Sequence, residues 1–362
     1  MSHYLDPLSN SGGSILLFLW GPVSLDIQEN VKLAPLTTLE IGGAARYFVH
    51  AERERHVAEA IAFARENGLD LFILGGGSNV LVSDRGFNGL VLQIGLKGID
   101  RSRVEFVTAA AGETWDPFVS YCVEHELAGV ECLSGIPGLV GGTPVQNVGA
   151  YGQEVSETIV SVRCFDREAS SFVTLSNEDC GFTYRTSIFN STERGRYIVL
   201  SVTFGLREGG EPWIAYKDLA EHFGGREPSL RHVRDAVLAI RASKSMVIDE
   251  ADPNRRSAGS FFKNPVVDTD SFERIRAGFE SVPHFDLGDR VKIPAAWLIE
   301  NSGFRKGFVL ANAGISTKHT LAIVNRGEAT ANEILALKEK IQSAVFTKFG
   351  IELQPEPVFV GF

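Results

Sequence analysis

The chain has 362 residues, more than one hydrophobic core usually serves, so its length predicts two or three domains. Hydrophobic residues make up 44% and charged residues 22% of the sequence, which excludes a wholly disordered chain. The formal net charge of -10 and the lack of a long basic run argue against a nucleic-acid partner.

Residues 1–30 are interpreted as an N-terminal extension of unassigned role. The extension contains the apolar run ILLFLW at 15–20, far shorter than the roughly 20 residues that a membrane span needs. No basic residue precedes this run and no small-residue cleavage site is evident, which disfavours a secretory signal. We therefore expect a protein without a membrane partner, located in the cytoplasm.

Four cysteines are irregularly spaced and form no CxxC pair. This spacing favours free thiols in a reducing compartment over disulfides, and we predict no metal site. The cysteines are Cys122, Cys132, Cys164 and Cys180.

The first half of the chain alternates predicted helices and strands. A helix is predicted over His56–Asn67, with an apolar face at Val57, Ala60, Ile61 and Ala64. A second helix is predicted over Thr114–Leu127, where Pro117 is tolerated in the first turn. Short apolar runs predict strands at residues 71–74, 80–82 and 90–94.

The second half begins with strands and ends with helices. Residues 160–206 are rich in β-branched and aromatic residues and predict strands, and 208–212 is the best linker candidate. A helix is predicted over Leu230–Ala242. The last helix is the clearest, because Thr330 and Glu333 form a capping box and Gly350 supplies the stop, before a terminal strand at 358–360. This order of elements indicates the α+β class.

Two glycine-rich segments are the first candidates for a binding site. The first glycine segment is Gly75-Gly76-Gly77-Ser78-Asn79-Val80, whose backbone N–H groups could form a nest for phosphate oxygens. Its spacing matches neither a Rossmann fingerprint nor a P-loop, so a merely flexible turn stays equally plausible on this segment alone.

The second glycine segment, residues 134–152, is nearly uncharged and therefore predicted to be buried against something. Glycines allow close approach and its amides offer donors and acceptors, which suits a planar ring with a diphosphate tail. A buried structural loop is the alternative. The candidate ligand-binding residues here are Ser134, Gly135, Ile136, Gly141, Gly142, Gln146, Asn147 and Ala150.

The ordered motifs GGGSNVL, SGIPGLVGGTPVQNVGAYG, YRTSIF and AGSFFKNP resemble the UDP-N-acetylenolpyruvoylglucosamine reductases, the MurB family, in their longer type I form. The resemblance covers about residues 36–361. It implies a two-part FAD-binding domain of the PCMH/VAO type at 31–210, a smaller α+β substrate-binding domain at 211–350, and a terminal strand at 351–362 that returns to the FAD site.

The resemblance also implies a reaction. NADPH reduces a non-covalently bound FAD, and hydride then passes to the double bond of UDP-N-acetylglucosamine enolpyruvate to give UDP-N-acetylmuramate for peptidoglycan synthesis. The expected protein is therefore an oxidoreductase, UDP-N-acetylmuramate dehydrogenase, acting as a monomer. The glycine segments would hold the cofactor.

Three residues match the catalytic positions of the family. Arg185, in the YRTSIF motif, would engage the substrate carboxylate and stabilise the enolate. Ser260, in AGSFFKNP, would protonate the carbanion-like carbon. Glu356, in QPEP, would have to be protonated or paired with Arg185 near the substrate carboxylate. The alternatives are a surface salt bridge, a turn serine and an exposed terminal acid.

Four further residues match substrate-binding positions of the family. Tyr216 resembles the tyrosine that closes over the substrate, Lys244 and Asn264 match positions around the diphosphate, and His319 matches a polar contact. A lysine after a helix is also favoured by the helix dipole, so Lys244 has this structural alternative. Pro357 departs from the family pattern, where a β-branched residue is usual.

Two other functions remain open at this stage. An oxidase of small alcohols or sugars on the same FAD scaffold would need the glycine segments but not Arg185, Ser260 and Glu356 together. Many such oxidases tether flavin through His or Cys, and the GGGSN loop contains neither. A non-catalytic flavin or nucleotide carrier would leave the three residues without a role.

Overall fold

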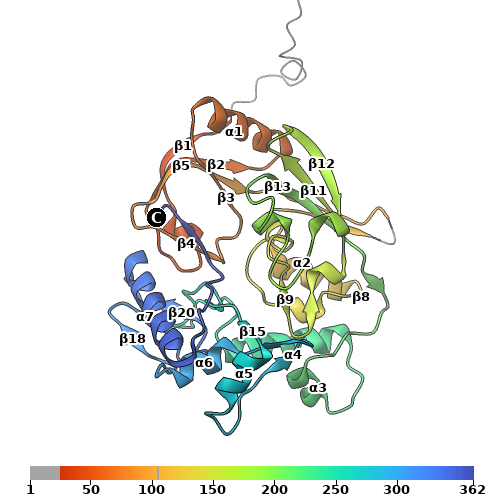
Figure 1. The fold of residues 1–362 in the computed structure, drawn as a ribbon. Coiled ribbons are helices and arrows are strands. Elements are labelled where there is room, and N and C mark those ends of the chain that lie inside the picture. Colours follow the sequence, from red (N-terminus) through yellow and green to blue (C-terminus); the bar gives the residue numbers. More distant parts are fainter. Residues whose placement is uncertain (1–24, 104–105) are drawn as a thin grey trace, which may run out of the picture.

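A computed structural model describes residues 25–103 and 106–362 (Figure 1). Most of the expected N-terminal extension, with its apolar run at 15–20, lies outside the described residues, whereas Gln28–Lys32 form β1. The helices are α1 (Glu54–Glu66), α2 (Trp115–Glu124), α3 (Lys217–Phe223), α4 (Leu230–Ser243), α5 (Thr269–Arg276), α6 (Ala295–Asn301) and α7 (Ala331–Phe349).

Most strands are short and belong to several small sheets. They are β1, β2 (Ala44–Ala51), β3 (Leu71–Leu74), β4 (Val80–Val82), β5 (Phe87–Ile94), β6 (Ile99–Asp100), β7 (Val107–Ala110), β8 (Leu127–Ala128), β9 (Gly149–Ala150), β10 (Gln153–Glu154), β11 (Ile159–Asp166), β12 (Ser171–Ser176), β13 (Tyr197–Phe204), β14 (Arg207–Glu208), β15 (Val266–Asp268), β16 (Phe285–Asp286), β17 (Arg290–Lys292), β18 (Val309–Leu310), β19 (Ala313–Ile315), β20 (Ile323–Asn325) and β21 (Val358–Val360).

The N-terminal sheet has the order β1-β2-β5-β3, in which β2 and β3 both run parallel to β5. Helix α1 supplies the crossover between β2 and β3, as a parallel arrangement requires. The predicted apolar face of this helix is confirmed, because its buried residues are Val57, Ala60, Ile61 and Ala64. The short strand that follows the first glycine segment, β4, lies outside this sheet.

The middle of the chain forms an antiparallel sheet of order β12-β11-β13-β7-β6. The predicted strands between residues 160 and 206 are therefore confirmed. Helix α2 packs against this sheet through Trp115 and Phe118, whose rings contact Phe204 of β13. These side chains are fully buried and belong to one core with α1 and β5. Helices α3 and α4 pack on the same lobe, around the buried Cys132.

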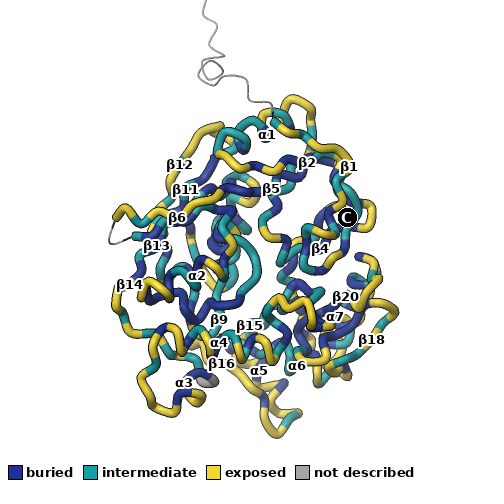
Figure 2. Tube along the Cα trace, turned by 180° about the vertical axis from the view of Figure 1, so that it is seen from behind, coloured by how far each residue is buried: buried dark blue, intermediate teal, exposed yellow. Residues whose placement is uncertain are grey.

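The C-terminal part has its own core, formed mainly by α5, α6, α7 and the sheet β18-β19-β20. The capping box of Thr330 and Glu333 is confirmed, and Gly350 ends α7 with a left-handed φ of 68°. Figure 2 shows mostly buried chain along β5, alternating buried and more exposed positions along β2 and α7, and mostly exposed chain around α3.

The last strand returns to the N-terminal lobe. β21 pairs in parallel with β4, and Val358 lies opposite Val80 (Figure 1). Pro357 directly precedes β21, where the missing N–H of proline removes no ladder hydrogen bond. This pairing brings Glu356 next to the first glycine segment. None of the helices formed by the described residues is long and apolar enough to cross a lipid bilayer.

Candidate active site

The first glycine segment is a tight turn between β3 and β4. Gly77 has a φ of 64°, and a Cβ atom there would lie 1.9 Å from the carbonyl oxygen of Leu36, so only glycine fits. Within residues 25–103 and 106–362, no hydrogen bond uses the backbone N–H groups of Gly76, Gly77 or Ser78. Free, consecutive N–H groups of this kind suit an anionic ligand.

The second glycine segment lies directly against the first. The Ser78 hydroxyl donates to the Pro137 carbonyl at 3.1 Å, and the Asn79 amide donates to Gln146 Oε1 at 2.8 Å. A Cβ atom on Gly76 would lie 2.7 Å from Gly138 Cα, so the two backbones touch at this point. The structure therefore brings together the two segments that the sequence indicated as ligand-binding.

Other residues of the second segment are held by backbone contacts. Gly135 N–H donates to Asp116 Oδ1 at 2.6 Å and Gly141 N–H to the Ala111 carbonyl at 2.9 Å. The Ser134 hydroxyl donates to the Glu131 carbonyl at 2.7 Å, which is a structural role. Ala150 pairs with Gln153 across β9 and β10. Ile136 and Val80 are half-buried beside these contacts.

The described residues fit an FAD molecule on two further counts. A Cβ atom on Gly75 or Gly142 would meet nothing within 4 Å, so open space borders both segments. Arg241, on the buried face of α4, approaches Gly135, and its Nε atom is buried without a hydrogen-bond partner. A buried cation and free N–H groups are the donors that a diphosphate requires.

Arg185 lies in a tight turn, residues 183–186, closed by two hydrogen bonds between Thr183 and Thr186. Its φ is 54°, a left-handed conformation that is uncommon outside glycine and recurs at functional sites. The guanidinium donates to the carbonyls of Asn147 at 3.3 Å and Gly149 at 2.6 Å, and no ion pair to a carboxylate within 4 Å is present in the described part of the chain. The charge of Arg185 therefore stays available to an anionic substrate.

Glu356 is fixed beside the segment that contains Ser260. Its backbone N–H donates to the Phe261 carbonyl at 2.9 Å, and its carbonyl accepts from the Asn79 amide at 3.3 Å. Burial raises the pKa of the Glu356 carboxyl, against the opposing effect of the Arg185 and Lys263 charges. The Arg185 guanidinium is therefore close enough to the Glu356 carboxyl for its charge to act on it.

The Ser260 hydroxyl has no hydrogen-bond partner among the described residues and is half-buried. Tyr184, next to Arg185, has its phenol oxygen hydrogen-bonded to the backbone of Asn264, four residues beyond Ser260. Burial raises the pKa of this phenol. Glu356 is thus hydrogen-bonded to the residue after Ser260, and Tyr184, the neighbour of Arg185, is hydrogen-bonded to the same 260–264 segment.

Lys244 and His319 lie close to each other. Burial, then the charges of Lys244 and Lys306, lower the pKa of His319 to about 4. The imidazole is therefore neutral near pH 7. The neighbours of both residues meet at Asp252, whose carboxylate accepts from the Ser245 hydroxyl at 2.6 Å and Lys318 Nζ at 3.0 Å.

Asp252 is buried, and its carboxylate is satisfied by several donors. Besides Ser245 and Lys318, it accepts from both the backbone and the side chain of Asn254. These hydrogen bonds and the Lys318 charge outweigh burial and hold the pKa of Asp252 well below its usual range. Because Ser245 follows Lys244 and Lys318 precedes His319, Asp252 fixes both predicted substrate-binding positions.

The other two predicted substrate residues, Tyr216 and Asn264, differ in the partners of their side chains. Tyr216 precedes α3 and packs edge-on against Tyr151, with ring centroids 5.4 Å apart. Tyr151 in turn hydrogen-bonds Arg241. The Asn264 side chain accepts a hydrogen bond from Ala295 N–H at 2.9 Å, at the start of α6, so its oxygen already has a structural partner.

Sequence reasoning missed Arg241, Tyr151 and Asp252. Arg241 could have been found, because it continues the apolar stripe of Val233 and Val237 at helical spacing, and a cation on a buried face needs a partner. Asp252 gave no such signal, since its donors come from segments far apart in the sequence.

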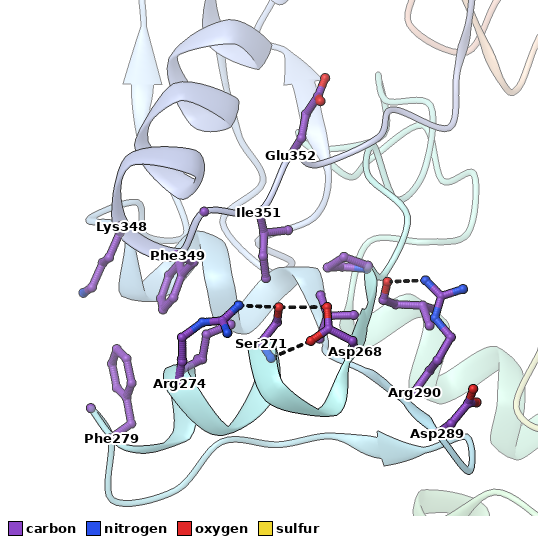
Figure 3. Close-up of a pocket in the computed structure, with 16 residues that line it drawn as sticks. Asp268, Ser271, Arg274, Phe279, Asp289, Arg290, Lys348, Phe349, Ile351 and Glu352 are labelled. Atoms are coloured by element: carbon purple, nitrogen blue, oxygen red, sulfur yellow. Dashed lines mark hydrogen bonds between the residues drawn. The ribbon is translucent and has the colours of Figure 1, made fainter.

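A separate cleft of about 990 Å³ lies in the C-terminal part, between α5, β17 and the end of α7 (Figure 3). Its walls are already engaged: Asp268 accepts from Ser271, which also accepts from Arg274, and Arg290 donates to the Val266 carbonyl. None of the predicted site residues lines this cleft. The glycine segments and the Arg185 turn, not this cleft, are the candidate active site.

The chain is similar to known proteins over most of its length. Residues 45–176 match the FAD binding domain model and residues 252–360 match the model described as UDP-N-acetylenolpyruvoylglucosamine reductase, C-terminal domain. Two UDP-N-acetylenolpyruvoylglucosamine reductases, from Thermobifida fusca and Streptomyces coelicolor, are 46% and 45% identical to it. Each alignment covers 92% of this chain, and 98% and 91% of the respective relative.

A solved structure shows the same architecture. The crystal structure of the reductase from Thermus caldophilus superimposes with a TM-score of 0.66 at 25% identity, covering 93% of this chain and 99% of the other. The predicted fold class, a two-part FAD-binding domain followed by a smaller α+β domain, is confirmed by these matches.

Proposed function

The chain belongs to the UDP-N-acetylenolpyruvoylglucosamine reductase family, and from that premise we propose that it reduces UDP-N-acetylglucosamine enolpyruvate to UDP-N-acetylmuramate with NADPH and bound FAD. The chain is an oxidoreductase with an FAD-binding domain and a role in cell-wall synthesis. The observations that carry the finer proposal are that the Arg185 charge acts on Glu356 and that the Glu356 backbone is hydrogen-bonded to Phe261, the residue after Ser260.

The two glycine segments would hold the cofactor. The free N–H groups of Gly76, Gly77 and Ser78 and the buried Arg241 would bind its diphosphate, and the open space beside Gly142 would admit its ring. When bound, FAD would take up hydride from NADPH and then supply it to the enolpyruvyl double bond. The chain's own residues would bind the substrate, stabilise the negative charge of the enolate and supply the proton to its carbon.

Arg185 would bind the carboxylate of the enolpyruvyl group. Two of its N–H groups are taken by the carbonyls of Asn147 and Gly149, and a guanidinium has five, so a bidentate contact to a carboxylate remains possible. Burial raises the pKa of Glu356, and whenever the acid is protonated it would donate a hydrogen bond to that carboxylate instead of repelling it. Both residues would stabilise the enolate as negative charge develops.

Ser260 would give the proton that completes the reduction. Its hydroxyl is unpartnered in the described residues and lies one residue from the carbonyl that anchors Glu356. A serine is a weak acid, so transfer requires a strongly basic carbon within hydrogen-bond reach, and a carbanion-like enolate meets that requirement.

The opposite end of the site would hold the sugar nucleotide. The charges of Lys244 and Lys306 act on the neutral His319, and the single opposing charge of Glu300 leaves this end electropositive. A diphosphate needs such cations and neutral donors. Tyr216, packed on Tyr151, would cover the bound substrate.

Ser260→Ala is the experiment that tests the reaction. We expect the variant to bind FAD and to be reduced by NADPH at the parent rate, while formation of UDP-N-acetylmuramate falls by about 10²- to 10⁴-fold. Flavin absorbance in a stopped-flow instrument separates the two half-reactions. Product formation at the parent rate would remove Ser260 from the mechanism.

The proposal also covers three further properties: the nicotinamide used, the cell compartment and the oligomeric state. We propose that NADPH is preferred and that the protein acts as a monomer in the cytoplasm. The four cysteines Cys122, Cys132, Cys164 and Cys180 are free and buried in the structure, as suits a reducing compartment. Steady-state assays with NADPH and NADH, and sedimentation of the purified protein, test these points.

A further inference from the structure

The direction of the Arg185 side chain is set by carbonyl groups, not by a carboxylate. Its guanidinium contacts the oxygens of Asn147 and Gly149, which lie on the second glycine segment. The Arg185 carbonyl accepts from the Asn190 amide at 3.2 Å, so the turn is held from both sides. Whatever orients the 147–149 carbonyls therefore also orients Arg185.

Asn147 is the residue on which these contacts converge. It is 1% exposed and has a left-handed φ of 44°, which asparagine tolerates better than most residues. Its amide donates to Glu154 Oε2 at 2.9 Å and to the Thr183 carbonyl at 3.1 Å. Its Oδ1 accepts from Ser156 N–H at 3.1 Å.

Both amide hydrogens of Asn147 are thus already used by the protein. The side chain has no donor left for a ring or a phosphate, although the sequence indicated it as a cofactor contact. The Thr183 carbonyl that it holds begins the Arg185 turn, and its own carbonyl contacts the guanidinium. Asn147 therefore acts on Arg185 through its side chain and through its backbone.

We propose that Asn147 is a positioning residue that aims Arg185 at the substrate carboxylate. This inference rests on the proposed function, because it assumes that Arg185 binds the enolpyruvyl group. Loss of the Asn147 side chain would remove its hydrogen bond to the Thr183 carbonyl and so loosen the Arg185 turn, which the Ser187 hydroxyl still ties to the Val145 carbonyl. A displacement of about 1 Å at a reacting group is enough to slow catalysis about 10²-fold.

The test uses Asn147→Gly in the full-length, FAD-loaded protein. Glycine keeps the left-handed backbone and removes only the amide. We expect unchanged flavin content and an unchanged rate of flavin reduction by NADPH. Reoxidation of the flavin by UDP-N-acetylglucosamine enolpyruvate should slow about 30-fold, and kcat should fall more than KM rises.

A double-mutant cycle with Arg185→Ala distinguishes positioning from general damage. If Asn147 acts through Arg185, Asn147→Gly should slow the Arg185→Ala variant by less than about threefold. The inference would be overturned if the double variant lost as much rate as the product of the two single losses, or if Asn147→Gly lost its flavin. Should Asn147→Gly not fold, Asn147→Asp retains the acceptor for Ser156 and lacks the two donors, and the same cycle applies.

Asn177 supplies the matched control. Its amide also donates to two backbone carbonyls, those of Ser156 and Ile159, and among the described residues it forms no hydrogen bond with the Arg185 turn. Asn177→Ala should lower the unfolding temperature and leave both half-reactions unchanged. A parent protein whose flavin the enolpyruvyl substrate never reoxidises would refute the proposed function, whereas an additive cycle in an active parent refutes the Asn147 inference alone.

Discussion

At the Arg185 end of the candidate site, neutral amides and carbonyls position the functional side chain, whereas at the Lys244 and His319 end an ionised carboxylate does so. Asn147 and Gly149 hold Arg185 through neutral carbonyls, and the Glu154 carboxylate contacts the Asn147 amide rather than the guanidinium. Asp252 holds the neighbours of Lys244 and His319 through charge-assisted hydrogen bonds. The difference teaches that the two ends should respond differently to pH and to substitution.

Removal of Asp252 should have the largest effect. Asp252→Ala leaves the buried Ser245 hydroxyl and the Asn254 N–H groups without their acceptor, and each such group costs about 1 to 3 kcal/mol, so we expect a loss of about 3 to 5 kcal/mol in the free energy of unfolding. Urea denaturation measures it. Asp268→Ala is the control, because Asp268 is an exposed helix cap that accepts from Ser271, and its loss should cost much less free energy of unfolding. Equal losses would contradict the comparison.

The second-largest effect should be a loss of folding stability in acid, caused by protonation of His319. The pKa of His319 is lowered to about 4 from an ordinary value of 6.5, so the unfolded chain takes up the proton first. The stability that neutral His319 contributes is present above pH 6.5 and is lost as pH falls toward 4, by about 3 kcal/mol in all.

Unfolding curves between pH 4 and pH 7 test this for His319→Asn, which should remove part of the pH dependence. The charges that act on His319 come from Lys244, Lys306 and Arg241, with Glu300 opposing them. An identical pH dependence in parent and variant would show that His319 does not titrate in this range.

Gly149→Ala should disturb the neutral end by crowding. A Cβ atom there would lie 2.9 Å from the Gln153 carbonyl oxygen and 3.0 Å from Arg185 Nη1. We expect a loss of about 1 to 3 kcal/mol in unfolding free energy and a reoxidation rate about tenfold lower. Gly278→Ala, where a Cβ atom would meet only the Ile275 carbonyl at 3.6 Å, should change neither.

Lys318→Met should have the smallest effect. The Lys318 side chain is 44% exposed, so its ion pair with Asp252 is screened by solvent and should contribute less than about 1 kcal/mol. Urea denaturation at low and high salt measures this contribution. A loss as large as that of Asp252→Ala would mean that the ion pair, not the hydroxyl and amide donors, stabilises this end.

Local sequence signals were enough for the elements that frame the site. The apolar spacing of α1 and the capping box of α7 depend on residues three or four apart, and both were predicted within a few positions. The motifs also marked the two glycine segments and Arg185. Long-range partners were beyond such signals, because they depend on how separate segments pack.

Asn147 and Asn264 illustrate that limit. Both carry amides that the sequence indicated as ligand contacts. In the structure, the Asn147 amide donates to Glu154 and to the Thr183 carbonyl, and the Asn264 amide oxygen accepts a hydrogen bond from the first N–H of α6. The sequence shows that an amide is present but not which neighbour uses it. A buried amide becomes a positioning group only through contacts made in the folded chain.

The pairing of β21 with β4 has a consequence for the order in which the protein forms. Asn79 and Glu356 are 277 residues apart and hydrogen-bonded, so the ribosome must complete nearly the whole chain before they can meet. Contacts this distant in sequence form late in folding, since a long loop must close first. The nascent protein should therefore acquire its flavin only after release, as one of the last steps of its maturation.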